Sequence, residues 1–289
     1  MRIANRIGRL GTETAFAVGA EAGAFAAQGN TVYPFHLGDL NLATPSTVVD
    51  GAFRAVTDGK TGYCPNAGIP QLRAALAADV SASHGVEYGP ENVVVQPGGK
   101  PTIGKFIMAL MNPGDEVLYP NPGYPIYESQ IEFHGGVAVP YAYIEGADGF
   151  ELDFDAMEAS ITDKTTLLIL NDLQNPMGAE SSTTEHAKLA ELVIKHDLYV
   201  LVDEAYFDMR YEGTSSSFVS QPGMLERSVI LYTFSKKFAM TGWRLGASIG
   251  PKEVVDVITK INVNDESCSN HFIQYGALAG LEGDQGEVR

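Results

Sequence analysis

The sequence predicts a doubly wound α/β fold, in which a mostly parallel sheet carries helices on both faces. Short runs rich in β-branched residues alternate along the chain with helical stretches, which is the pattern of repeated strand-helix-strand units. The strand-like runs are apolar throughout, as expected when helices cover both faces of a parallel sheet. A chain of 289 residues with 45% hydrophobic residues can also bury one large core.

Six apolar runs predict the strands, and the stretches between them predict helices. The strand candidates are residues 92–96, 116–120, 165–170, 198–204, 228–234 and 246–250. Residues 101–111 begin with a proline suited to a first helical turn, and residues 183–197 begin with threonines that can cap a helix. Residues 1–30 predict a helical arm, because charged residues interrupt every apolar stretch that could form a signal or membrane segment.

The charge and the cysteine content exclude several classes of function. A formal net charge of −17 would repel nucleic acid and anionic lipid, so we expect neither as a partner. The two cysteines, Cys64 and Cys268, have no spacing that suits a zinc site or a disulfide framework, and the six histidines have no metal-binding spacing. We therefore expect no metal site, and the reducing cytoplasm as the compartment.

Three segments place polar residues where predicted strands end. Ligands of doubly wound sheets bind at the carboxyl ends of the strands, so these segments are the candidates for a site. One carries Asp203, Glu204 and Tyr206, the next is "NDLQNPMG" at 171–178, which alone is typical of a turn, and the last is "TFSKKFAMTGWRLG" at 233–246. Strands ending in Asp-Glu also occur in magnesium-dependent nucleotide hydrolases, but "QPGGKPT" at 96–102 lacks the phosphate-loop pattern of that class.

The two adjacent lysines of the last segment have different expected roles. On a strand-like approach Lys236 points to one side and Ser235 and Lys237 to the other, so one lysine shares a face with the site. A lysine opposite a buried aspartate can form a Schiff base with an aldehyde, which removes the cost of an unpaired ammonium group. A pyridinium nitrogen would then supply the cation for the aspartate, and Arg244, eight residues after Lys236, suits a phosphate.

These residues lie in motifs that resemble the class I and II aminotransferases, a family of fold-type I pyridoxal-phosphate enzymes. The motifs are "TGYCPNAGIPQLR", "PNPGYPIY", "NPMG", "DEAY" and "SKKFAMTGWRLG", and they follow one another in register over nearly the whole chain. The lysine-to-arginine motif is the most specific, whereas "NPMG" alone is weak. The resemblance implies the fold-type I architecture, pyridoxal 5'-phosphate as cofactor and a homodimer.

The resemblance implies three catalytic residues. Lys236 matches the lysine that forms the Schiff base with the cofactor, and its released amine would move the α-proton of the amino acid to a cofactor carbon. Asp203 matches the carboxylate that keeps the pyridine nitrogen protonated, so that the ring accepts electrons, and Tyr206 matches a donor to the phenolic oxygen. The implied reaction is a ping-pong transfer of an amino group from an amino acid to a 2-oxo acid, such as 2-oxoglutarate.

Further residues match binding positions of the family. Asn175 matches a second donor to the phenolic oxygen and part of the substrate site, and Tyr124 matches the aromatic ring that stacks on the cofactor. Gly38 matches the glycine that lets the substrate approach the backbone. The groups that match the phosphate site are Thr233, Ser235, Arg244, the backbone amides of Gly99 and Lys100 at a helix start, and, in a homodimer, Tyr63 from the neighbouring subunit.

The chain departs from the family pattern near both ends. The family continues beyond "NHFIQYGALAGLEGDQGEVR" and there supplies the arginine that binds the substrate carboxylate, so we expect a fragment with an incomplete small domain. The alternative is that Arg2, Arg6 or Arg9 takes that role, and "HLGDLN" also has Asp39 and Leu40 where glutamate and proline are usual. The expected division is 1–44 as arm and part of the small domain, 45–280 as cofactor domain and 281–289 as the start of a truncated segment.

Other reactive residues have ordinary explanations. Lys100 lies in a glycine turn suited to phosphate, and Lys105 follows on a helix, where a lysine is normally solvated. Cys64 follows Tyr63 in a loop, and we expect it to be incidental and not nucleophilic.

Other functions that use the same motifs stay open. Lyases and cyclising synthases of this fold type differ in their substrate pockets and not in these motifs, and a sensor module would bind the cofactor without catalysis. Product analysis with several amino acids separates the enzymes from one another. A cofactor spectrum that ignores every amino acid would indicate the sensor. The sequence does not indicate which amino acid is the donor.

Overall fold

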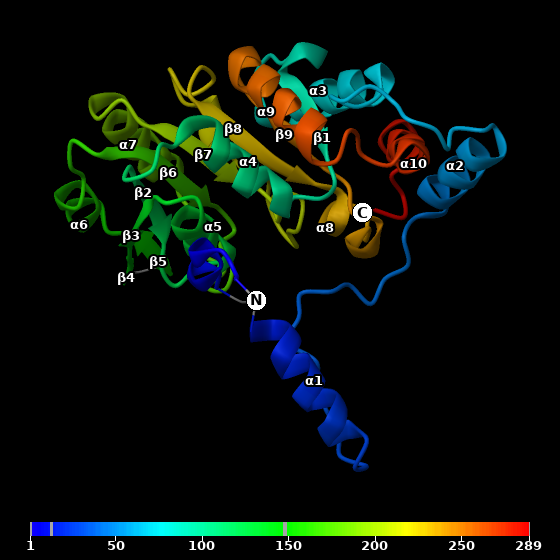
Figure 1. Cartoon of the computed structure of the whole chain (residues 1–289), viewed down its shortest axis with the longest axis horizontal. Coiled ribbons are helices and arrows are strands. Elements are labelled where there is room, and N and C mark those ends of the chain that lie inside the picture. The colour runs from blue at the N-terminus through cyan, green and yellow to red at the C-terminus, as the bar shows by residue number, and fades with distance from the viewer. Residues whose placement is uncertain (1, 12–13, 147–148, 289) are drawn as a thin grey trace.

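The computed structural model describes residues 2–11, 14–146 and 149–288 of the chain (Figure 1). Within these residues the central sheet consists of β1 (Val93–Gln96), β2 (Glu116–Pro120), β3 (Val137–Tyr141), β6 (Thr165–Asn171), β7 (Tyr199–Asp203), β8 (Ser228–Thr233) and β9 (Gly246–Ile249). The strand order is β1-β9-β8-β7-β6-β2-β3. β9 runs antiparallel to β1 and β8, and the other neighbouring strands are parallel to each other. A mostly parallel sheet is therefore confirmed.

Helices cover both faces of this sheet, as predicted. One face carries α4 (Lys100–Leu110), α5 (Ile126–Phe133) and α9 (Lys252–Asp265). The other face carries α3 (Pro70–His84), α7 (Thr183–Lys195) and α10 (His271–Glu282), with α2 (Ser46–Thr57) packed against α10. The remaining elements are η1 (Asn5–Arg9), α1 (Thr14–Ala26), η2 (Pro90–Asn92), β4 (Tyr143–Glu145), β5 (Phe150–Leu152), α6 (Phe154–Ala159), η3 (Phe218–Ser220), α8 (Phe234–Lys237) and η4 (Thr241–Trp243).

The central strands are apolar throughout because their side chains pack into two hydrophobic cores, one on each face of the sheet. In β6, Leu167 and Ile169 pack into the core under α4, α5 and α9, whereas Leu168 and Leu170 pack into the core under α3, α7 and α10. Successive side chains of a strand point to opposite faces, so a strand buried on both sides needs apolar residues at every position. This is the physical reason why the unbroken apolar runs predicted the sheet correctly.

The predicted elements agree with the observed ones, and the strands that were not predicted are β3 and the separate pair of β4 and β5. All six predicted strands are present, and the two predicted helices correspond to α4 and α7, where Ser182 caps α7 in a capping box with Glu185. β3 was not predicted, because it is an edge strand with Pro140 inside it and with Tyr141 as its one buried residue. An edge strand covered on fewer sides has no continuous apolar run.

The amino-terminal arm is helical, as expected, and α1 projects away from the sheet in Figure 1. None of the described side chains of α1 is buried, and Phe16 and Phe25 are 62% and 51% exposed. The loop that follows also exposes Phe35. The division of the chain into an arm, a cofactor domain and a truncated segment stays a prediction.

Lys105 overturns the expectation of a solvated lysine. It is 1% exposed on α4, and its Nζ donates hydrogen bonds to Gln96 Oε1 at 3.0 Å and Asn262 Oδ1 at 2.8 Å. Glu266 Oε2 accepts a further bond at 2.6 Å. The ammonium group therefore joins α4 to the end of β1 and to the end of α9, where burial is tolerated because all three donors are used and one partner is a carboxylate.

Candidate active site

The sheet topology brings the predicted site segments to one edge. β2, β6, β7 and β8 are parallel, so their carboxyl ends lie together, and Asn171 at the end of β6 pairs in register with Asp203 at the end of β7. At the same edge, the first residue of the antiparallel β9, Gly246, is in register with both Thr233 and Gln96. The turns after β1, β6, β7 and β8 and the turn before β9 therefore meet.

A cradle suited to phosphate lies between the turn after β1 and the start of β9. Gly98 has a φ of 109°, and a Cβ atom there would overlap Nη2 of Arg244. A Cβ atom on Gly99 would lie 3.2 Å from Cβ of Thr233, so the glycine backbone lies directly against both side chains. α4 begins at Lys100, and the start of a helix favours an anion through its backbone amides and its dipole.

Local bonds fix the side chains of this cradle. Thr233 caps α8 by accepting a hydrogen bond from the amide of Ser235 at 3.2 Å, and its hydroxyl lies 3.0 Å from the Ser235 hydroxyl. Arg244 has a left-handed φ of 55°, and its Nη1 donates to the carbonyl of Thr241 at 2.7 Å. Such a backbone conformation is uncommon for a residue other than glycine. The cation, the hydroxyls and the helix start fit a phosphate group.

Asp203 is a buried carboxylate whose surroundings supply no compensating cation. Its Oδ2 accepts a hydrogen bond from the Tyr127 hydroxyl at 2.6 Å, and its Oδ1 accepts one from the amide of Ala205 at 3.1 Å. In the part of the chain that the structure describes, no lysine, arginine or histidine is among the groups that shift its pKa. Burial raises the pKa of Asp203 to about 6, against the lowering effect of these two bonds. A ligand cation at this carboxylate would remove that cost, which fits a pyridinium nitrogen.

Lys236, Gly38 and Tyr206 come together although they are distant in sequence. The Nζ of Lys236 donates a hydrogen bond to the carbonyl of Gly38 and lies 5.7 Å from the centre of the Tyr206 ring. A Cβ atom on Gly38 would lie 3.4 Å from this Nζ and 3.8 Å from the Tyr206 hydroxyl. The glycine thus allows the backbone to approach the amine closely, and its predicted role toward the substrate stays a prediction.

The two adjacent lysines have separate surroundings. The strand-like geometry expected for residues 235–237 is wrong, because β8 ends at Thr233 and these residues form the short helix α8. Lys237 forms ion pairs with Asp79 at 2.9 Å and Asp208 at 3.5 Å. Of the two adjacent lysines, Lys236 lies beside Gly38 and Tyr206, and its role as the cofactor lysine stays a prediction.

Tyr124 and Asn175 are each connected to Asp203 by one intermediate residue, Tyr127 and Asn171 respectively. The Tyr124 ring meets the Tyr127 ring edge to face at 5.7 Å, and the Lys100 Nζ lies 5.7 Å from the centre of the Tyr124 ring. Asn171 Oδ1 accepts a hydrogen bond from the Asn175 amide at 3.0 Å, and Asn171 Nδ2 donates to the Asp203 carbonyl at 3.1 Å. Both predicted residues are therefore held beside the end of β7.

Tyr63 and Cys64 lie in the loop after α2. Tyr63 is 89% exposed, and its predicted contact concerns a neighbouring subunit, so that role stays a prediction. Burial, followed by the neighbouring Cys268 thiol, raises the pKa of Cys64 to about 11. Its thiol is therefore protonated at neutral pH and a poor nucleophile, which supports the interpretation of Cys64 as incidental.

Sequence reasoning missed three residues of the site. Tyr127 lies within the quoted "PNPGYPIY" motif, but a tyrosine in a helix gives no signal that it binds a carboxylate 76 residues away. Asn171 could have been found, because it ends an apolar strand with a polar side chain, as Asp203 does. Gly98 could have been found from the adjacent glycines, since the positive φ of a turn favours glycine.

The described residues contain neither a metal-binding cluster nor a membrane-spanning helix. No group of three or more histidine, cysteine, aspartate or glutamate side chains among them could hold a metal ion. None of their helices has both the length and the hydropathy needed to cross a bilayer.

The family of the chain follows from its similarity to known proteins. The family model "Aminotransferase class I and II" matches residues 34–289. A probable aspartate/prephenate aminotransferase of Aquifex aeolicus is 34% identical over 97% of this chain and 71% of its own length, and the aspartate aminotransferase of Musicola paradisiaca is 33% identical over 98% and 71%.

Solved structures agree with this assignment. The aspartate aminotransferase of Thermus thermophilus with maleate superposes with a TM-score of 0.94 at 33% identity, covering 100% of this chain and 75% of that one. The N-succinyldiaminopimelate aminotransferase of Mycobacterium tuberculosis has a TM-score of 0.91 at 28% identity over 99% and 74%. The chain belongs to the class I and II aminotransferases, enzymes that move an amino group between an amino acid and a 2-oxo acid.

Proposed function

We propose that this aminotransferase binds pyridoxal 5'-phosphate at the carboxyl edge of its sheet, and that an amino acid and a 2-oxo acid react there in turn. The observation that carries the proposal is the arrangement of a phosphate cradle, a buried carboxylate bonded by two neutral donors and a lysine amine at the same sheet edge. Bound there, pyridoxal 5'-phosphate supplies a ring that accepts electrons from the substrate α-carbon.

The phosphate cradle would orient the cofactor. Arg244, the hydroxyls of Thr233 and Ser235 and the amides at the start of α4 would hold the phosphate. Tyr124 would cover one face of the ring, and Asn175 and Tyr206 would donate to its phenolic oxygen. These side chains come from the turns after β1, β2, β6, β7 and β8 and the turn before β9.

Lys236 and Asp203 would perform the proton chemistry. The Nζ of Lys236 would take the proton from the substrate α-carbon, since a positioned amine beside the Gly38 carbonyl and Tyr206 can act as general base. Asp203 would hold the ring nitrogen protonated, because a buried carboxylate favours a cation beside it. Tyr127 and the amide of Ala205 would keep the Asp203 carboxylate oriented.

We further propose that the chain works as a homodimer in the cytoplasm. The arm exposes Phe16, Phe25 and Phe35, and Tyr63 is exposed on the loop after α2. Exposed aromatic residues of this number mark surfaces that another chain covers, and a second copy would also bring its Tyr63 toward a phosphate.

Gly98→Ala should weaken binding of the cofactor through its phosphate. The new methyl group would displace the Arg244 guanidinium, and loss of one contact to a charged group lowers affinity by roughly tenfold. Fluorescence titration should show this loss for pyridoxal 5'-phosphate and no loss for pyridoxal, which has no phosphate. Gly114→Ala is the matched control, because its φ of 93° gives similar strain and a Cβ atom there meets nothing within 4 Å. Equal effects of the two substitutions would contradict the cradle.

Product analysis separates the proposed reaction from its alternatives. The chain loaded with pyridoxal 5'-phosphate is mixed with one amino acid at a time, and 2-oxo acids, ammonia and cyclic products are measured by mass spectrometry. Aspartate is the first donor to test and 2-oxoglutarate the first acceptor, because several relatives are named aspartate aminotransferases. We expect a 2-oxo acid without ammonia. Release of ammonia or a cyclic product would indicate a lyase or synthase, and a spectrum unchanged by every amino acid would indicate a sensor.

A further inference from the structure

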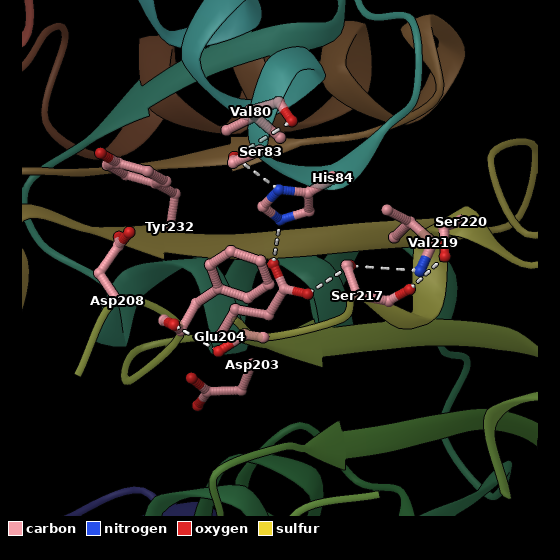
Figure 2. Close-up of polar contacts among 12 residues, drawn as sticks. Val80, Ser83, His84, Asp203, Glu204, Asp208, Ser217, Val219, Ser220 and Tyr232 are labelled. Atoms are coloured by element: carbon pink, nitrogen blue, oxygen red, sulfur yellow. Dashed lines mark hydrogen bonds and ion pairs between the residues drawn. The ribbon is translucent and has the colours of Figure 1, made fainter. Parts of the chain in front are cut away.

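A buried polar cluster behind the end of β7 has no part in the proposed chemistry. Glu204 directly follows Asp203, but the two side chains leave the chain in opposite directions, and Glu204 points toward His84 at the end of α3 (Figure 2). His84 Nε2 and Glu204 Oε2 are 2.6 Å apart, and the two side chains are 4% and 5% exposed. Two buried ionisable groups at this distance need a defined proton arrangement.

Donor counting places one proton between the two groups. The Ser83 Oγ lies 2.8 Å from both the Asp79 carbonyl oxygen and His84 Nδ1, so that with its one proton on the carbonyl it would accept a hydrogen bond from Nδ1. On the other side, the Ser217 hydroxyl donates to Glu204 Oε1, which therefore carries no proton. In this arrangement the remaining contact, Nε2 to Oε2, would hold one proton, and the pair would have no net charge whichever atom binds it.

The pair also holds the turn that carries the catalytic residues. Phe207 stacks on the His84 ring with centroids 4.3 Å apart, and its amide donates to the Glu204 carbonyl at 3.1 Å. The Ala205 amide donates to Asp203 Oδ1 at 3.1 Å. Residues 204–207 are thus held by contacts with His84 on one side of the strand and by the bond from Ala205 to Asp203 on the other.

We propose, on the basis of the function proposed above, that His84 is a positioning residue for Asp203. By sharing a proton with Glu204, it leaves Asp203, and not its neighbour, with the net negative charge at the end of β7. Without His84, Glu204 would be a second buried negative charge beside the carboxylate that has to ionise. The electrostatic surroundings of Asp203 agree, because after burial a charge on Glu204 is a further cause that raises the pKa of Asp203.

Other charged groups surround the pair and have to be accounted for. Lys237 forms its ion pairs with Asp79 and Asp208 in a cavity of about 20 Å³ that His84 and Glu204 also line. Tyr88 has its buried hydroxyl near Glu204. These groups are the same in two chains that differ only at position 203. The difference in unfolding free energy between the Asp203 chain and the Asp203→Asn chain therefore cancels the contribution of their own titration.

The test measures how strongly Asp203 resists ionisation in the unliganded chain. The difference in unfolding free energy between the Asp203 and Asp203→Asn forms is recorded against pH in three backgrounds: unchanged, His84→Gln, and His84→Gln with Glu204→Gln. In the unchanged background, the difference in unfolding free energy should stop changing with pH near pH 6, the pKa of Asp203 in the folded chain. In the His84→Gln background this pH should rise by roughly one unit. In the background with both His84→Gln and Glu204→Gln it should return to its first value. Mere loss of packing would not be restored by a second substitution.

The same three backgrounds, loaded with pyridoxal 5'-phosphate, extend the test to the holoenzyme. The pH midpoint of the visible absorbance change should also rise in His84→Gln and return when Glu204→Gln is added. Unmoved transitions in His84→Gln, or a shift that Glu204→Gln does not reverse, would overturn the role of His84. A shift in the unliganded chain without any cofactor band would support that role and contradict the proposed function instead.

Discussion

Lys236→Ala is expected to abolish amino transfer and the covalent attachment of the cofactor. The amine of Lys236 is the group that lies beside Gly38 and Tyr206, and no other lysine side chain shares this place among the described residues. A positioned general base contributes roughly 10² to 10⁴ in rate, so turnover should fall by at least about 10²-fold. Stopped-flow absorbance after mixing with an amino acid measures the loss directly.

Lys237→Ala is the matched control for this result. Lys237 is adjacent in sequence, but its Nζ pairs with Asp79 and Asp208. The control should keep the covalent cofactor and most of the activity. Near-normal turnover in Lys236→Ala, or loss of the covalent bond in Lys237→Ala, would show that the lysine has been assigned wrongly.

Asp203→Asn is expected to reduce proton removal from the substrate by roughly 10² to 10³-fold, the usual cost of losing one electrostatic group aimed at developing charge. Asparagine keeps the size of the side chain and one acceptor oxygen for the Ala205 amide, and its amide nitrogen would face the Tyr127 hydroxyl, but it has no charge to hold the ring nitrogen protonated. The measured quantity is the rate of the first half-reaction with the amino acid in excess. A rate within a few-fold of the unchanged chain would remove Asp203 from the mechanism.

The same substitution should stabilise the unliganded chain above pH 6. The folded pKa of Asp203 is raised from 3.8 to about 6, so the stability that the protonated carboxyl provides is complete below pH 3.8 and is lost as the pH rises to 6. At pH 7 the ionised carboxylate then costs about 3 kcal/mol, a cost that the neutral amide of Asp203→Asn does not incur. Urea unfolding should show equal stability at low pH and a more stable Asp203→Asn chain at pH 7. The opposite order would mean that another group compensates the charge.

The fold and the main site residues could be predicted because their signals are local. Strands buried on both faces need apolar residues at every position, and the polar residues that end them must then lie at the sheet edge, as Asp203 does. The spacing of Lys236 and Arg244 likewise depends on one turn and one strand start. Such features are encoded within a few residues of each other, so the sequence shows them directly.

The remaining features depend on contacts between distant segments. Lys105 is buried because Gln96, Asn262 and Glu266 converge on it, and nothing in the helix pattern around Lys105 indicates those partners. His84 faces Glu204 across 120 residues for a similar reason. The contact of Lys236 with Gly38 was not predicted, because their separation of 198 residues leaves no pattern in a single sequence.

The central claim is that Lys236, and not a neighbouring lysine, binds the cofactor covalently at this sheet edge. The most direct measurement is borohydride reduction of the chain loaded with pyridoxal 5'-phosphate, followed by proteolysis and fragment sequencing by mass spectrometry. The structure predicts one stable pyridoxyl group on Lys236 and an unmodified Lys237 in the same peptide. A pyridoxyl group on Lys237, Lys100 or Lys105 in place of Lys236, or none at all, would contradict the claim.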